Sequence, residues 1–231
     1  MSIAKNLTEI KSQLPQHVTL VAVSKTKPVS DLMEAYNAGQ RIFGENKIQE
    51  MTEKWEQMPK DIEWHMIGHV QSNKVKFMAE YVSLIHGVDS LKLLQEINKQ
   101  AKKHNRVIDC LLQIHIAEEE TKFGLDEFEL DEILTRVYEQ CEAKQVQNEK
   151  SEFENIRIVG LMGMATFTEN QNQIEKEFNH LNSIFDKHSK LETSNLKLQT
   201  LSIGMSGDYQ LAISCGSTMV RIGSSIFGNR N

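Results

Sequence analysis

A lysine stands at the carboxyl end of the first apolar run of this sequence. The stretch VTLVAVSKTKP begins with β-branched and aliphatic residues and ends in two lysines and a proline. Because residues two apart in a strand share a face, Val21, Val23 and Lys25 are predicted to form one column. Lys27 directly precedes the proline and is predicted to lie in the turn. Burial lowers the pKa of a lysine so that its neutral amine can attack an aldehyde, whereas a solvated lysine has no such chemistry.

A second group of polar residues ends the seventh apolar run, in IGMSGDY. Gly204 and Gly207 permit close approach of the backbone, and Ser206 offers a hydroxyl group. Asp208 is placed to cap the next short helix. These residues suit an anion such as phosphate, and an ordinary glycine turn is the alternative. The serine-hydrolase pattern G-x-S-x-G is incomplete, because Asp208 stands in the place of its last glycine.

The last apolar run, MVRIGSSIFG, carries a charge inside a predicted strand. Arg221 shares a face with Met219 and Gly223, and its charge must find a partner there. Gly223 and Ser224 then provide backbone and hydroxyl donors. Two such loops at neighbouring strand ends favour a phosphate site more strongly than either loop alone.

Other polar residues have simpler interpretations. Asn46 in GENKIQE either points into the site or caps a helix with Gln49 in reciprocation. His65 and His69 are four residues apart but fall on a predicted strand, and the glutamate of the H-E-x-x-H zinc motif is missing. We therefore expect no metal site. The three glutamates at 118–120 are interpreted as a solvated loop.

Apolar strands alternate with amphipathic helices along the whole chain. Strands are predicted at 18–25, 41–46, 62–70, 82–89, 108–116, 156–165, 198–206 and 219–228. Helices are predicted at 3–14, 30–39, 47–58, 72–81, 90–105, 127–141, 172–189 and 208–216. Ser30 is expected to cap the second of these helices and Gly39 to close it. The polar segment 143–156 is expected to be an irregular connector.

This alternation indicates a parallel sheet covered on both faces. Eight strands in 231 residues favour an α/β fold, a single (β/α)8 TIM-type barrel with an additional N-terminal helix. A doubly wound open sheet is the alternative. Residues 1–231 show no linker and are expected to form one domain. In such barrels the site lies at the carboxyl ends of the strands, and phosphate is often held after strands seven and eight.

The composition excludes several classes of function. The formal net charge of −6 argues against a role based on nonspecific phosphate neutralisation on nucleic acid. No apolar segment approaches the length needed to span a membrane. The three cysteines are far apart and odd in number, which favours reduced thiols over disulfides. We expect a cytoplasmic protein.

Six stretches together resemble the pyridoxal 5′-phosphate (PLP) homeostasis protein family, single-domain relatives of the alanine racemase N-terminal barrel. They are VAVSKTKP, FGENKIQE, WHMIGHVQSNK, GLMGMA, LSIGMSGDY and VRIGSSIFG. Each alone is a weak signal, but their combination in this order is highly specific. The stretches run from the first predicted strand to the last, so the resemblance covers essentially the whole chain.

The resemblance implies a barrel that holds PLP as a covalent aldimine with Lys25. The cofactor-binding residues that it implies are Lys25, Asn46, Ser206, Arg221, Gly223 and Ser224. Ser206 and residues 223–224 match the phosphate-binding positions, and Arg221 matches the arginine that faces the pyridine nitrogen. Asn46 matches an asparagine near the cofactor.

A carrier of PLP is favoured over an enzyme. A PLP enzyme needs a second acid/base group, which alanine racemase takes as a tyrosine from a separate C-terminal domain. No such domain is expected after the eighth strand. Tyr36, Tyr81 and Tyr138 are predicted to lie in helices, and only Tyr209 lies near the phosphate loop. Arg221 stays protonated and would leave the cofactor a poorer electron sink than an aspartate partner would.

We therefore expect no catalytic residue and a role in vitamin B6 and amino-acid/keto-acid homeostasis. The expected recipients are PLP-dependent apo-enzymes, and the resemblance implies a monomer. Two alternatives are an amino-acid racemase, with Lys25 as one base and water or Tyr209 as the other, and a cofactor-free Schiff-base aldolase. The racemase predicts exchange of the Cα proton of an amino acid. The aldolase predicts a colourless protein whose Lys25 is trapped by a sugar phosphate.

Overall fold

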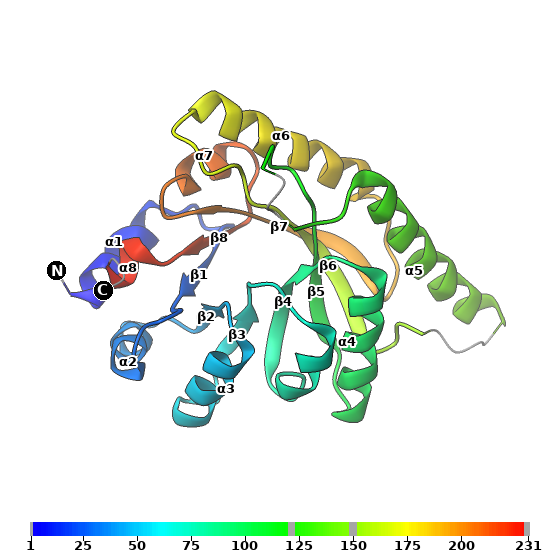
Figure 1. The fold of residues 1–231 in the computed structure, drawn as a ribbon, viewed down its shortest axis with the longest axis horizontal. Helices are drawn as coiled ribbons and strands as arrows, with labels where there is room; N and C mark the ends of the chain where they lie inside the picture. The colour runs from blue at the N-terminus through cyan, green and yellow to red at the C-terminus, as the bar shows by residue number, and fades with distance from the viewer. Residues whose placement is uncertain (1, 120–122, 148–151, 229–231) are drawn as a thin grey trace.

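The strands of the computed structural model, which describes residues 2–119, 123–147 and 152–228, close into a parallel barrel (Figure 1). Each strand pairs with the next in chain order, and the last pairs with the first, with Thr19 opposite Met219. The strands are β1 (Thr19–Val23), β2 (Ile42–Glu45), β3 (Glu63–Met66), β4 (Val82–Val88), β5 (Ile108–Gln113), β6 (Ile156–Met162), β7 (Leu196–Met205) and β8 (Met219–Ile222). The barrel prediction is confirmed, and the open-sheet alternative is wrong because β8 pairs with β1.

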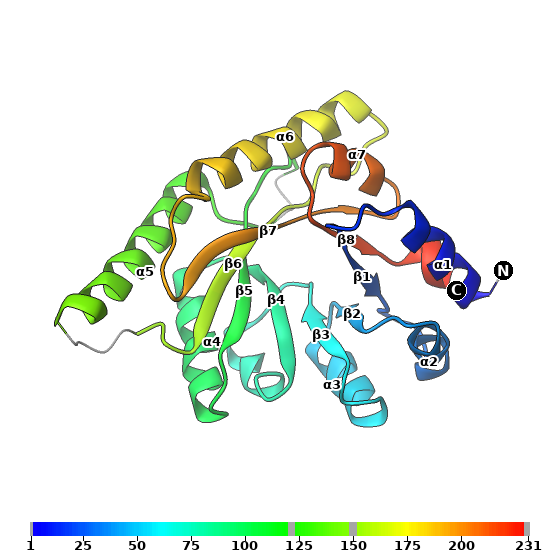
Figure 2. The ribbon, with the colours of Figure 1, turned by 180° about the vertical axis from the view of Figure 1, so that it is seen from behind.

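Helices follow the strands and lie outside them, as the view from behind shows (Figure 2). They are α1 (Ile3–Gln13), α2 (Val29–Asn37), α3 (Ile48–Gln57), the 3₁₀ helix η1 (Ser72–Phe77), α4 (Leu91–Lys103), α5 (Glu127–Gln147), α6 (Gln171–His188), α7 (Tyr209–Ser214) and α8 (Ser224–Phe227). The main apolar core lies between these helices and the strands, with Trp64 and Phe43 among its largest members. A smaller separate cluster comes from strands around the barrel: Val21, Leu84, Leu111, Met162 and Met219.

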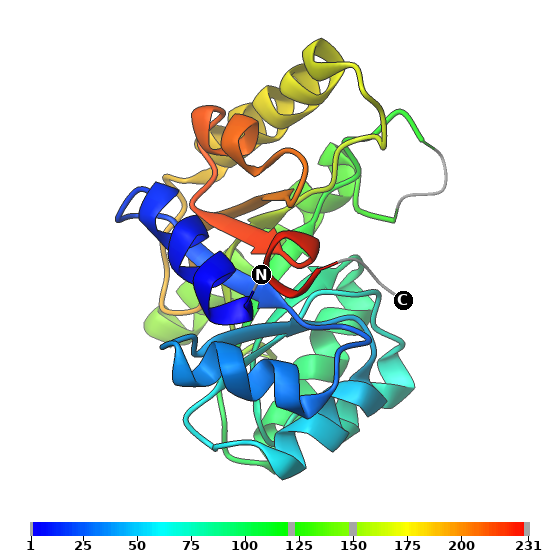
Figure 3. The same cartoon turned by 90° about the vertical axis from the view of Figure 1, so that its left-hand side faces the viewer.

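Local sequence signals start several helices where they were expected. The side chains of Ser2, Ser90 and Asn170 each accept a hydrogen bond from the backbone three residues later, at 3.2, 3.3 and 3.3 Å. Such N-caps satisfy amide groups that lack a partner within the helix. The predicted N-terminal helix is confirmed as α1, which lies beside α8 (Figure 3). Asn6 Nδ2 donates to the Ile226 carbonyl oxygen at 3.0 Å and ties the two helices together.

Several boundaries differ from the predictions. Ser30 lies inside α2, because Pro28 occupies the N-cap position. Residues 72–77 form a 3₁₀ helix rather than a longer α-helix. The last strand ends at Ile222, and a short helix takes up the serines that follow. Helix α5 continues through Gln147 into the predicted connector, of which residues 148–151 lie outside the described part of the chain.

The described residues contain neither a membrane-spanning helix nor a disulfide. None of the described helices combines the length and the apolar character needed to cross a membrane. Cys110, Cys141 and Cys215 are buried free thiols.

Candidate functional site

The six predicted site residues meet in one cavity at the carboxyl ends of the strands. Its volume is about 460 Å³. The predicted residues in its wall are Lys25, Asn46, Ser206, Arg221, Gly223 and Ser224. They come from the ends of β1, β2, β7 and β8, which the closed parallel barrel brings to one edge. The structure thus brings together residues that are up to 199 positions apart in the chain, from 25 to 224.

Lys25 reaches the cavity from a turn rather than from the strand itself. β1 ends at Val23, so the predicted column stops two residues before Lys25, although Val23 and Lys25 line the same cavity. The turn is closed by the Lys27 amide, which donates to the Ser24 carbonyl oxygen at 3.0 Å. Lys27 also lines the cavity, which its predicted place in the turn did not indicate.

Arg221 on β8 is buried and is held by Ser202 within β7 and by Gly163 directly after β6. Its Nη1 donates to the carbonyl oxygen and the Oγ of Ser202 at 2.7 and 2.6 Å, and its Nη2 donates to the Gly163 carbonyl oxygen at 2.9 Å. Burial lowers the pKa of Arg221 to about 10, and the charge of Asp208 acts against this shift. The guanidinium therefore stays protonated at neutral pH. The sequence argument that this charge needs partners is confirmed.

A chain of hydrogen bonds continues from Arg221 across the inside of the barrel. Ser202 Oγ lies 3.2 Å from His86 Nδ1, and His86 Nε2 lies 3.1 Å from His65 Nδ1. His65, His86 and Ser202 are at most 3% exposed. Burial lowers the pKa of His65 to about 3 and that of His86 well below its ordinary value. Both imidazoles are therefore neutral at neutral pH.

Arg221 can only donate, so Ser202 Oγ accepts from it. The Ser202 hydroxyl group either donates to His86 Nδ1 or accepts from it with its second lone pair, depending on the tautomer of His86. Between His86 Nε2 and His65 Nδ1 one nitrogen donates and the other accepts. The backbone carbonyl oxygens of Ser202 and Gly163 hold Arg221 with either tautomer.

The loops after β7 and β8 are joined directly. The Gly223 amide donates to Ser206 Oγ at 3.2 Å, which leaves the Ser206 hydroxyl proton available for a ligand. Ser224 and Ser225 begin α8, where first-turn amides have no acceptor within the helix. Asp208 occupies the N-cap position of α7, but its carboxylate accepts from the Met205 amide at 2.5 Å instead of capping the helix. The two loops therefore place hydroxyl and amide donors on one wall of the cavity, as the anion-binding interpretation requires.

The sequence matches the family model described as "Alanine racemase, N-terminal domain" over residues 1–231. The "Pyridoxal phosphate homeostasis protein" of Pasteurella multocida is 37% identical over 245 aligned positions, which cover 100% of this chain and 99% of that protein. This chain belongs to the pyridoxal phosphate homeostasis protein family. Two structures of PipY from Synechococcus elongatus, without and with PLP bound, are 32% and 33% identical with TM-scores of 0.87 and 0.82. Each match covers 98% of this chain and 100% of PipY.

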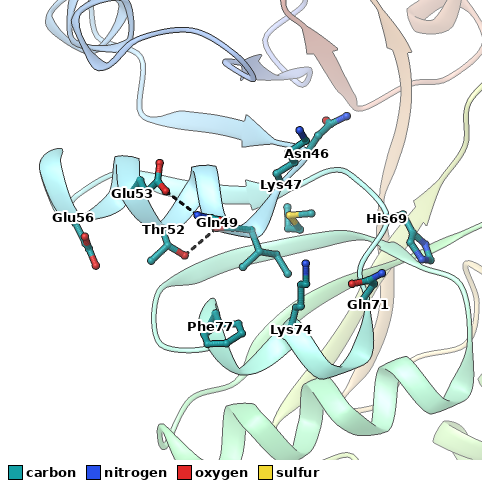
Figure 4. A pocket seen from close by; sticks show the side chains of 12 residues that line it. Asn46, Lys47, Gln49, Thr52, Glu53, Glu56, His69, Gln71, Lys74 and Phe77 are labelled. Carbon is teal, nitrogen blue, oxygen red and sulfur yellow. Dashed lines mark hydrogen bonds between the residues drawn. The ribbon is translucent and has the colours of Figure 1, made fainter.

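Asn46 lines both the strand-end cavity of this family member and a second hollow. That hollow, about 630 Å³, lies between α3 and η1 (Figure 4). Lys74 and Phe77 rise from η1 toward α3, whose residues Gln49, Thr52 and Glu53 also line the hollow. Apart from Asn46, the second hollow contains none of the predicted site residues. The N-cap alternative for Asn46 is wrong, because Lys47 holds that position and makes no side-chain cap bond.

The remaining candidates point away from the cavity. The Tyr209 hydroxyl donates to Gln13 Oε1 at 2.9 Å, on α1, so the tyrosine nearest in sequence to the phosphate loop is turned outward. His69 is exposed and lies 3.2 Å from Asp89, whereas His65 lies inside the barrel. The two histidines therefore do not converge. Of the three glutamates expected to be solvated, Glu119 accepts from the Phe167 amide at 2.8 Å and joins two loops, and Glu120 lies outside the described residues.

Sequence reasoning missed the residues that support the site from below. His86 and Ser202 lie within the predicted strands 82–89 and 198–206, whose apolar pattern gives them no role. One signal was present, because a histidine within the run VSLIHGV is a polar residue at a position where apolar side chains are expected. His86 and Ser202 are 116 positions apart in sequence, so their contact could not be assigned from the pattern.

Gly204 gives a test of the loop that carries Ser206. Its φ is +95°, and a Cβ there would lie 2.6 Å from Ala212 Cβ on α7. Gly204→Ala is therefore expected to lower the free energy of unfolding by about 2–3 kcal/mol. Gly207→Ala is the matched control three residues away, since a Cβ there meets nothing within 4 Å, and should change stability by less than about 1 kcal/mol. Urea denaturation of both variants measures the difference; equal losses would contradict this account of the loop.

Proposed function

We propose that this protein binds PLP in the strand-end cavity, through a covalent Schiff-base linkage to the Lys25 amine, and that it holds and delivers the cofactor. One observation carries the proposal: Lys25, Arg221 and the donors of Ser206 and Ser224 line one cavity of about 460 Å³. The family relationship supports it, because the relatives are named for pyridoxal phosphate homeostasis and one PipY structure has PLP bound.

The residues of the cavity fit the three chemical features of PLP. The volume falls in the range of about 300–1,000 Å³ that is usual for small-ligand sites. Ser206 and Ser224 can donate to the phosphate, and Lys25 is the amine that would condense with the aldehyde and release water. Among the described residues, Arg221 places three of its five N–H groups on Ser202 and Gly163, so donors remain for the pyridine nitrogen. When bound, the cofactor supplies a reactive aldehyde and an electron-withdrawing ring.

A carrier role suits this lining better than turnover does. Of the described residues that line the cavity, none is a histidine, a tyrosine, a cysteine or a glutamate. Tyr209, the expected second base of a racemase, donates to Gln13 instead. We propose that the protein maintains vitamin B6 and amino-acid/keto-acid balance as a monomer in the cytoplasm and hands PLP to apo-enzymes. The three buried thiols agree with a reducing compartment.

The racemase alternative keeps one point of support. Lys27 and Asp208 line the same cavity as Lys25, and their side chains can donate or accept a proton. Burial raises the pKa of Asp208, which makes its carboxyl group a candidate acid. We therefore retain racemase-type activity as the second function to test.

Transfer and exchange assays separate the two functions. The loaded protein should restore the activity of a PLP-dependent apo-enzyme, and it should exchange the Cα proton of alanine in deuterated buffer no faster than the same concentration of PLP does. Nuclear magnetic resonance follows the exchange, and Lys25→Ala is the control. Exchange well above that of PLP alone, lost in Lys25→Ala, would overturn the carrier proposal in favour of the racemase.

A further inference from the structure

The turn that presents Lys25 has a strained backbone. Thr26 follows Lys25 with a φ of +65°, in the left-handed region. In a four-residue turn, a positive φ at the third position is typical of glycine, and a β-branched residue there is an outlier. Such a conformation persists only where the surrounding structure enforces it. Side chains from β2 and α3 hold the residues on either side of Lys25.

A buried lysine on α3 holds the residue before Lys25. Lys54 Nζ donates to the Ser24 carbonyl oxygen at 2.8 Å, and to one oxygen each of Glu45 and Glu50 at 2.7 Å. The Lys54 side chain is 6% exposed and that of Glu45 is 0% exposed. The ammonium group thus uses its three donors on two carboxylates and on the backbone beside Lys25.

The same two carboxylates hold the turn from both sides. Glu45 Oε1 accepts from the Ser24 hydroxyl at 2.6 Å, and Glu50 Oε1 accepts from the Thr26 amide at 2.6 Å. The residues before and after Lys25 are therefore both fixed by charged side chains. We call Glu45, Glu50 and Lys54 the turn clamp.

Stabilising α3 against the barrel does not by itself explain this cluster. Buried ion pairs add little net stability, because desolvation of the charges offsets their attraction. Glu45 illustrates this cost: burial raises its pKa despite the nearby Lys54 charge, and its Oε2 has no hydrogen-bond partner among the described residues. Each of the three clamp residues instead makes one hydrogen bond to a polar group of Ser24 or Thr26, the residues that flank Lys25.

We propose that the turn clamp is a positioning device that aims the Lys25 amine at the aldehyde of the ligand. This inference rests on the proposed function and adds to it the residues that determine covalent capture. Misplacement of a reacting group by about 1 Å can change its reactivity about 100-fold. The clamp should therefore govern the covalent step and leave the phosphate and ring contacts on β7 and β8 unchanged.

Two ligands that differ only at the reacting group test this separation. PLP carries an aldehyde, and pyridoxine 5′-phosphate carries a hydroxymethyl group that cannot condense with lysine. Glu50→Ala removes the acceptor of the Thr26 amide from a partly exposed side chain, and Lys54→Met removes the buried ammonium group. We expect both variants to bind PLP about 10- to 100-fold more weakly, and pyridoxine 5′-phosphate with unchanged affinity. Lys99→Met, which breaks an exposed ion pair with Glu96 on α4, is the control and should alter neither affinity.

The outcomes distinguish failure of the inference from failure of the proposed function. If wild-type protein fails to take up PLP covalently, the proposed function is wrong. If wild-type protein captures PLP and Glu50→Ala captures it equally well, the clamp does not position Lys25. Equal weakening of both ligands would also overturn the inference, because it would indicate a general structural defect. Glu50→Ala keeps the test valid if Lys54→Met does not fold.

Discussion

Acidification from pH 7.5 to pH 5 should lower the free energy of unfolding of this protein by about 4 kcal/mol through two buried histidines. His65 and His86 have folded-state pKa values of about 3 and well below 6.5, because burial disfavours their charged forms. Unfolding restores ordinary values near 6.5. Below pH 6.5 the unfolded chain thus binds protons that the folded chain does not, and stability falls as the pH falls.

The size of this effect follows from proton linkage. Each histidine contributes up to about 1.4 kcal/mol per pH unit below its unfolded pKa, and two such groups give the expected total.

Urea titrations at several pH values measure this dependence. The double variant His65→Gln/His86→Gln cannot titrate at these positions and should show a much flatter profile, even if it is less stable at neutral pH. His104→Gln, at an exposed position after α4, should keep the wild-type slope. Burial also lowers the pKa of His188, so His188 adds a further loss of stability in acid. This loss is the same in all three proteins. A double variant with the wild-type slope would contradict the buried-neutral assignment.

The strand ends were predictable from sequence, and the contacts beneath them were not. Alternation of strands and helices placed residues such as Arg221 and Ser206 at the carboxyl ends of neighbouring strands, where a closed barrel must bring them together. This reasoning needs only the order of elements. The position of Lys25 was predicted for the same reason, although the strand stops at Val23.

Contacts between distant elements depend on side-chain packing, which the alternation of strands and helices in the sequence does not specify. Ser202 meets His86 across the barrel, and Lys54 meets the Lys25 turn from a helix 30 positions later. A lysine on an amphipathic helix is ordinarily solvated, so nothing in the sequence marked Lys54 as buried. Two residues also competed for the start of α2. Pro28 takes the N-cap position, so Ser30 lies one residue inside the helix.

Replacement of Lys25 is expected to have the largest effect on ligand capture. Lys25 and Lys27 line the same cavity two residues apart, so the structure offers two amines to an aldehyde. The clamped turn fixes both neighbours of Lys25, through Ser24 and Thr26. Loss of Lys25 should therefore abolish covalent capture, whereas loss of Lys27 should leave it largely intact.

Borohydride reduction of the PLP-loaded protein, followed by peptide mapping, tests the central claim most directly. Wild-type protein and Lys27→Ala should show a visible absorption band, and reduction should fix one pyridoxyl group on Lys25. Lys25→Ala should lack both the band and the modified peptide. A colourless wild-type protein, or a pyridoxyl group fixed on another lysine of the wild-type protein, would contradict the account.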